Sequence, residues 1–165
     1  MAGGAERGGG EVTCGEERPT VRVESNRFGS FDVPQEKILV FPQGLIGFPD
    51  GRHYVILEHR PGSPFRWMLS IENPDLAFAV ADPSDLVGGY APSLDLAARL
   101  LSAEPSDVVL FVLVTIPPDP TLMTVNLLAP VVVDVRTRTA LQIVLDDERF
   151  SPSHFVVPQM ESIGP

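Results

Sequence analysis

Cysteine and long apolar runs are scarce in this chain. Cys14 is the only cysteine among 165 residues, so no disulfide can form within the chain, and we expect a reducing compartment. The apolar run at residues 108–116 spans nine positions, too few to cross a membrane, and no signal peptide is recognisable. The sequence therefore predicts a cytoplasmic protein without a membrane anchor.

Basic residues are also few. There are 12 of them against 22 acidic residues, which gives a formal net charge of -10. Such a chain repels phosphate groups, so direct binding to nucleic acid is disfavoured, whereas a basic protein partner would be attracted. Ordinary solubility is the alternative explanation of the acidity.

Composition divides the chain into three parts. Residues 1–18 are glycine-rich and charged and cannot offset the entropy of ordering, which predicts a disordered N-terminal tail. Residues 19–150 carry apolar patterns throughout and predict a single domain that needs neither a disulfide nor a metal to fold. Residues 151–165 contain three prolines and no periodicity, which predicts an irregular C-terminal tail.

The stretch from 108 to 145 is the predicted centre of the core. Residues 108–116 are rich in β-branched side chains, typical of a strand buried on both faces, and prolines stop it at 117 and 118. Residues 123–127 alternate between apolar and polar, and two further apolar segments follow at 131–135 and 141–145. Four consecutive strands with short connections predict an antiparallel meander.

The rest of the domain also favours strands. A hairpin is predicted at 20–24 and 28–33, with further strands at 37–41, 53–58, 65–71 and 76–81. A short helix is predicted at 93–101, where Ser93 can cap the first turn. The fold class is therefore mainly β: a small antiparallel β-barrel-like single domain with one or two short helices.

Catalytic motifs are missing. The three histidines match no HExxH spacing, and CxxC, GxSxG and phosphate-binding glycine patterns are absent, so we expect no metal, no cofactor and no catalytic residues. Two acidic groups follow predicted strands and are expected to stay solvated: Asp82 with Asp85, and Asp146, Asp147 and Glu148. Both groups are candidates for steering a basic partner.

Two carboxamides lie in otherwise apolar strands. Asn126 and Gln142 must each find hydrogen-bond partners if they are buried, and they face solvent if they are not. Both are candidate partner-binding residues.

Five motifs in order give the chain a specific resemblance. FPQGLIGF at 41–48, PFRWMLS at 64–70, PDLAF at 74–78, VTIP at 114–117 and MTVNLLAP at 123–130 resemble signatures of the flagellar assembly factor FliW family. The match covers about residues 20–149. The chain departs from the family at Leu69, Leu128, Ala140 and Leu141, positions that we expect at surfaces.

The resemblance implies a non-enzymatic, mainly β cytoplasmic protein with two partners. One is flagellin before its export. The other is CsrA, a small basic dimer that represses translation of flagellin messenger RNA, and flagellin would compete with it for the FliW-like protein. The residues themselves leave an enzyme open, one that uses Asp82, Asp85, Asp146 or Asp147 at a barrel mouth, and they leave open a purely structural β domain.

Overall fold

The computed structural model describes residues 19–58 and 60–156, and the N-terminal tail predicted at 1–18 lies outside these ranges. Its strands are β1 (Thr20–Ser25), β2 (Gly29–Pro34), β3 (Leu39–Val40), β4 (His53–Glu58), β5 (Phe65–Ser70), β6 (Ala77–Ala81), β7 (Val108–Thr115), β8 (Thr124–Val125), β9 (Val131–Asp134), β10 (Thr139–Gln142) and β11 (His154–Phe155). The helical elements are the α-helix α2 (Asp95–Leu101) and the 3₁₀ turns η1 (Gln35–Lys37), η2 (Pro83–Asp85), η3 (Pro105–Asp107) and η4 (Pro120–Leu122). The predicted mainly β class is confirmed.

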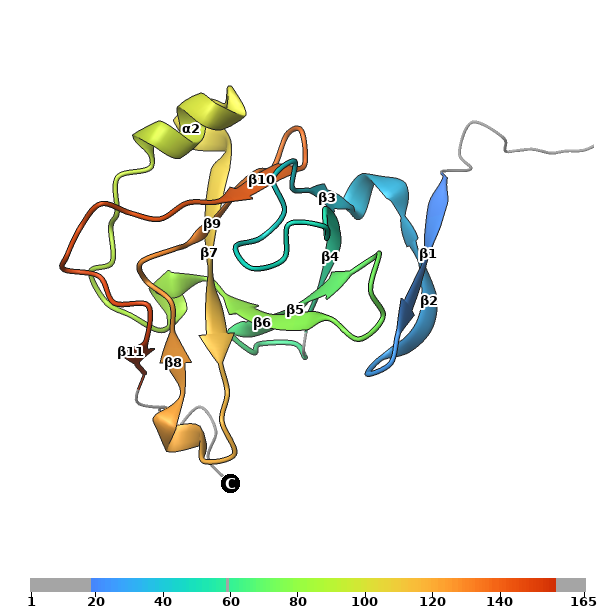
Figure 1. Ribbon diagram of the computed structural model, residues 1–165, viewed down its shortest axis with the longest axis horizontal. Helices are drawn as coiled ribbons and strands as arrows, with labels where there is room; N and C mark the ends of the chain where they lie inside the picture. Colours follow the sequence, from blue (N-terminus) through green and yellow to red (C-terminus); the bar gives the residue numbers. More distant parts are fainter. Residues whose placement is uncertain (1–18, 59, 157–165) are drawn as a thin grey trace, which may run out of the picture.

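β1 and β2 form the predicted hairpin as a separate two-stranded sheet at one end of the molecule (Figure 1). Val23 of β1 and Val33 of β2 are buried and pack on Val55 and Leu69 of the larger sheet. The alternation of apolar and polar residues that predicts these two strands is therefore the pattern of one covered face.

The larger sheet closes on itself. Its strands follow the order β11-β8-β7-β6-β5-β4-β3-β10-β9, and β9 pairs again with β7. A ring of strands results: β7, β6, β5, β4, β3, β10 and β9. All of these neighbours are antiparallel except β3 and β10, which run parallel through Thr139 and Val40, so the purely antiparallel arrangement predicted from sequence is wrong at that junction.

The meander predicted for residues 108–145 is also wrong in its pairing. β8 does not pair with β9; both lie along the same edge of β7, β8 opposite Val114 and Thr115, and β9 opposite residues 108–111. Residues 126–130 separate them as a bulge, which shifts the pairing with β7 by three residues between β8 and β9. The two segments thus act as one interrupted partner of a long strand.

The core lies inside the ring and on both sides of β7. Leu39, Phe41, Tyr54, Met68 and Val131 belong to the central cluster, where burial and the charge of Glu72 raise the pKa of Tyr54 to about 12. Val112 of β7 is fully buried in a neighbouring cluster. The burial on both faces predicted for residues 108–116 is confirmed only at the centre of this segment, because Val109 is 40% exposed and Ile116, just after β7, is 48% exposed.

The helix α2 lies over β9 and β10 (Figure 1), with Ala97 packed on Val132 and Ile143. It begins at Asp95 after Leu94, which makes no side-chain cap bond, so the cap predicted at Ser93 is wrong. Its last turn ends on Ser102 in the left-handed region. Among the described residues, no helix is long and apolar enough to span a membrane.

The segment after 150, predicted to be irregular, contributes a strand. β11 pairs antiparallel with β8 at the end of the sheet, and the Val156 amide donates to the Met123 carbonyl. Residues 157–165 of the predicted tail lie outside the described ranges.

Candidate partner-binding surface

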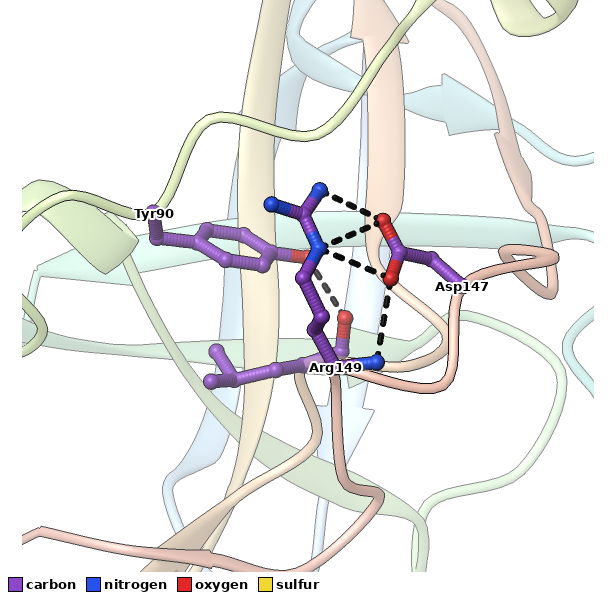
Figure 2. Close-up of polar contacts among 4 residues, drawn as sticks. Tyr90, Asp147 and Arg149 are labelled. Atoms are coloured by element: carbon purple, nitrogen blue, oxygen red, sulfur yellow. Dashed lines mark hydrogen bonds and ion pairs between the residues drawn. The ribbon is translucent and has the colours of Figure 1, made fainter.

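The loop that carries Asp146, Asp147 and Glu148 is built around the second of these carboxylates. Arg149 donates to Asp147 from its backbone amide at 3.0 Å, from Nε at 3.0 Å and from Nη2 at 2.6 Å (Figure 2). Side-chain hydrogen bonds from Arg149, and then its amide, lower the pKa of Asp147 to about 2. Asp147 therefore stays ionised at neutral pH and serves to shape the loop.

Asp146 precedes this ion pair in the chain, Glu148 lies between its two members, and both are exposed. Since Arg149 offsets the charge of Asp147, these two carboxylates supply the outward negative charge of the loop. They remain the loop's candidates for attracting a cation on a partner.

The other acidic group divides in the same way. Asp82 Oδ1 accepts from the Ser84 amide at 2.9 Å and from the Ser84 hydroxyl at 2.7 Å, so it caps the start of η2. Asp85, at the end of η2, is exposed. In each group, one carboxylate holds the backbone and at least one other faces solvent.

An aromatic pair brings the chain after η2 beside the acidic loop. The rings of Tyr90 and Phe150 meet edge to face with centroids 4.9 Å apart. The Tyr90 hydroxyl donates to the Leu127 carbonyl at 2.6 Å (Figure 2), and burial raises the pKa of Tyr90 to about 12. Sequence reasoning missed Tyr90, because no local signal connects residues that lie sixty positions apart.

The two carboxamides bind backbone atoms. Asn126 Oδ1 accepts from the amides of Leu128 at 3.1 Å and Ala129 at 2.9 Å, which closes the bulge between β8 and β9. Gln142 Nε2 donates to the Ala129 carbonyl at 3.0 Å, and Gln142 Oε1 accepts from the Ile46 amide at 2.9 Å. Both side chains are half-buried, so the interpretation that they simply face solvent is wrong.

Neither of two surface hollows involves the acidic groups. One, of about 420 Å³, is lined by residues of the hairpin, β4 and the turn after β9, including Ile38, His53 and Arg138. The other, of about 360 Å³, lies at the hairpin tip beside Pro74 and Asp75. Within the described ranges, no three His, Cys, Asp or Glu side chains gather as metal ligands.

Two of the four departures from the family pattern are buried. Leu69 is 1% exposed and Ala140 fully buried, whereas Leu128 and Leu141 are half-buried. The expected surface position is therefore wrong for Leu69 and Ala140, where small or apolar side chains fill the core instead.

A family model described as "FliW protein" matches residues 22–156. The chain belongs to the FliW family. It is 42% identical over 132 residues to the flagellar assembly factor FliW of Bdellovibrio bacteriovorus, covering 78% of this chain and 75% of that one. It is 33% identical over 143 residues to the FliW of Syntrophus aciditrophicus, covering 86% and 90%.

A crystal structure of the flagellar assembly factor FliW matches this chain with a TM-score of 0.75 and 26% identity, covering 84% of this chain and 98% of that one. The fold is thus that of the family.

In the motif at 41–48, the first glycine is required by the backbone. Gly44 has φ of +69°, and a Cβ there would lie 2.6 Å from the Phe48 carbonyl oxygen. That loop carries the Ile46 amide to Gln142.

Proposed function

We propose that this chain is a cytoplasmic flagellar assembly factor that binds two proteins, flagellin and the translational regulator CsrA. By binding CsrA it relieves repression of flagellin messenger RNA, and flagellin displaces CsrA from it. The observation that carries the proposal is the family match over residues 22–156, which spans almost all of the described chain.

The charge distribution supports a basic partner such as CsrA. The net charge is -10, and Asp85, Asp146 and Glu148 are exposed. The Tyr90–Phe150 contact brings the chain after η2 beside the loop that carries Asp146 and Glu148. A long-range field of this kind speeds the encounter of oppositely charged proteins more than it strengthens the closed complex.

The enzyme alternative receives less support from the geometry. The carboxylates of Asp82 and Asp147 each accept a hydrogen bond from a backbone amide. Because the pKa of Asp147 is about 2, this group is ionised near neutral pH and has no proton to donate there. Neither hollow is lined by Asp82, Asp85 or the acidic loop. A paired-carboxylate site would need two such groups facing a shared cleft.

Binding is tested with purified chain, CsrA, flagellin and a flagellin leader RNA. We expect the chain to form a complex with each protein, to release RNA from CsrA, and to lose CsrA when flagellin is added. A chain that binds neither protein, or that leaves the CsrA–RNA complex intact at saturating concentration, contradicts the proposal.

Steering is tested by association kinetics with CsrA. Raising the salt from 0.1 M to 0.5 M shortens the Debye length from about 10 Å to roughly 4–5 Å, so association should slow by on the order of tenfold while dissociation changes less. Asp146→Lys should slow association more than Glu24→Lys, which makes the same charge change on β1 at the far end of the molecule (Figure 1). Equal effects of the two variants would show that only net charge matters.

A further inference from the structure

One edge of the ring is left open beyond β10. β3 pairs with β10 only through Val40 and Thr139, after which the Phe41 amide donates to the Arg52 carbonyl and the chain turns away. On the edge of β10 that faces β9, backbone pairing continues past Gln142. The Ile143 amide donates to the Pro130 carbonyl at 3.2 Å, and the Leu145 amide donates to the Leu128 carbonyl at 2.8 Å. Residues 143–145 are therefore an extended segment paired on one side only.

Val144 lies at the middle of this segment. Since the amides of Ile143 and Leu145 point toward the bulge, the amide and carbonyl of Val144 point to the opposite edge. Within residues 19–58 and 60–156, nothing forms a hydrogen bond with either group. The Val144 side chain is 63% exposed.

The surroundings of this edge are apolar and then acidic. Gln142 and Val144 are two positions apart, so their side chains face the same side of the extended segment. The Gln142 side chain accepts a hydrogen bond from the Ile46 amide, so Ile46 lies on that side too. Ile46 is 56% exposed. Asp146 and Glu148, also exposed, come directly after the segment.

We propose that a partner adds one extended strand along this edge, through the backbone of Val144. An unpaired amide and carbonyl on an extended segment specify a strand as the occupant, rather than a helix or a small molecule. An apolar side chain of that strand packs on Ile46 and Val144, and a lysine or arginine near it meets Asp146. The inference rests on the proposed function, in that the strand belongs to CsrA, the basic one of the two proposed partners, whose charge complements the exposed Asp146 and Glu148 beside this edge.

The first experiment follows amide hydrogen exchange by NMR in the complexes with CsrA and with flagellin. We expect the Val144 amide to exchange at least tenfold more slowly in the CsrA complex, because a new backbone bond protects it, and to exchange in the flagellin complex as in the free chain. If CsrA binds while that amide exchanges as in the free chain, strand addition by CsrA is overturned and the proposed function stands.

A substitution separates the backbone from the side chain. Val144→Pro removes the amide donor without removing a bond of the fold, and should weaken binding about tenfold, whereas Val144→Thr keeps the donor and should weaken it less than threefold. Leu100→Ser, at a residue 62% exposed on α2, is the matched control and should have no effect. Equal affinities for Val144→Pro and the unaltered chain would refute the proposal.

A third measurement is independent of the partners' identity. A blocked six-residue peptide of alternating lysine and valine, at millimolar concentration, should shift the amide signals of Gln142 and Val144, and a peptide with glutamate in place of lysine should not. If the chain binds neither protein, the proposed function fails, and the peptide still tests whether the edge at Val144 accepts an added strand. Failure of the lysine peptide to shift these signals would then overturn the edge as well.

Discussion

The bulge closed by Asn126 gives the sharpest stability prediction. Asn126→Ala removes the Oδ1 that accepts from the amides of Leu128 and Ala129, at 3.1 and 2.9 Å. Each bond contributes about 0.5–1.5 kcal/mol net, so the loss should be about 1–3 kcal/mol of the free energy of unfolding. Part of this loss is the cost of leaving the amides of half-buried Leu128 and buried Ala129 without an acceptor.

Urea unfolding followed by circular dichroism measures the change. We expect a lower midpoint with an unchanged slope against urea, because the surface exposed on unfolding stays the same. In thermal unfolding, a loss of about 2 kcal/mol should lower the Tm by roughly 6–10 °C for a domain of this size.

Asn126→Asp is the matched control, because its carboxylate keeps the acceptor for both amides. It should retain most of the stability at pH 7 and lose it when acid protonates the introduced carboxylate. Two outcomes would refute the reasoning: an Asn126→Ala variant as stable as the unaltered chain, or an Asn126→Asp variant no more stable than Asn126→Ala.

Three further predictions concern burial and titration. Val112→Asp should unfold the domain by placing an unpaired carboxylate at a fully buried site, at a cost of several kcal/mol, while Val109→Asp, at a residue 40% exposed on the same strand, should still fold in a thermal melt. The chain has two tyrosines, each with a pKa raised to about 12, so tyrosinate absorbance at pH 10 should be nearly absent in the folded chain and half-developed in the chain unfolded by urea. The stability that comes from both raised pKa values is present below pH 10 and is lost as the pH rises toward 12. In an NMR titration, Arg149→Ala should return the pKa of Asp147 from about 2 toward 3.8. The variant should also lose the stability that the lowered pKa contributes, which is present above pH 3.8 and is lost as the pH falls toward 2, and an unchanged pKa would contradict the assigned cause.

Local patterns predicted the strands better than their partners. The alternation in residues 20–33 identified the hairpin, and the β-branched run at 108–115 identified β7, because each pattern reflects burial along one segment. Closure of the ring depends on the pairing of β7 with β9 and of β3 with β10, which join segments far apart in the chain. Alternation says which face of a strand is buried but not which strand lies beside it.

The bulge escaped prediction for a related reason. Residues 126–130 read as the end of one strand and a proline before the next, which is also the pattern of a simple turn. The side chain of Asn126 distinguishes the two, since it binds the amides two and three residues ahead. Likewise, Ser93 has the residue type of a cap, yet the helix begins two residues later, at Asp95.

The bulge also determines where the open edge lies. The Leu145 amide binds the Leu128 carbonyl, and Gln142 binds the Ala129 carbonyl, so both ends of the segment that presents Val144 depend on residues whose amides Asn126 holds. The Ile46 loop is tied to the same place through Gln142. Loosening the bulge should therefore free the segment and the loop together. A strand that docks at Val144 would add backbone bonds to this unit, so binding there should stabilise the bulge in turn.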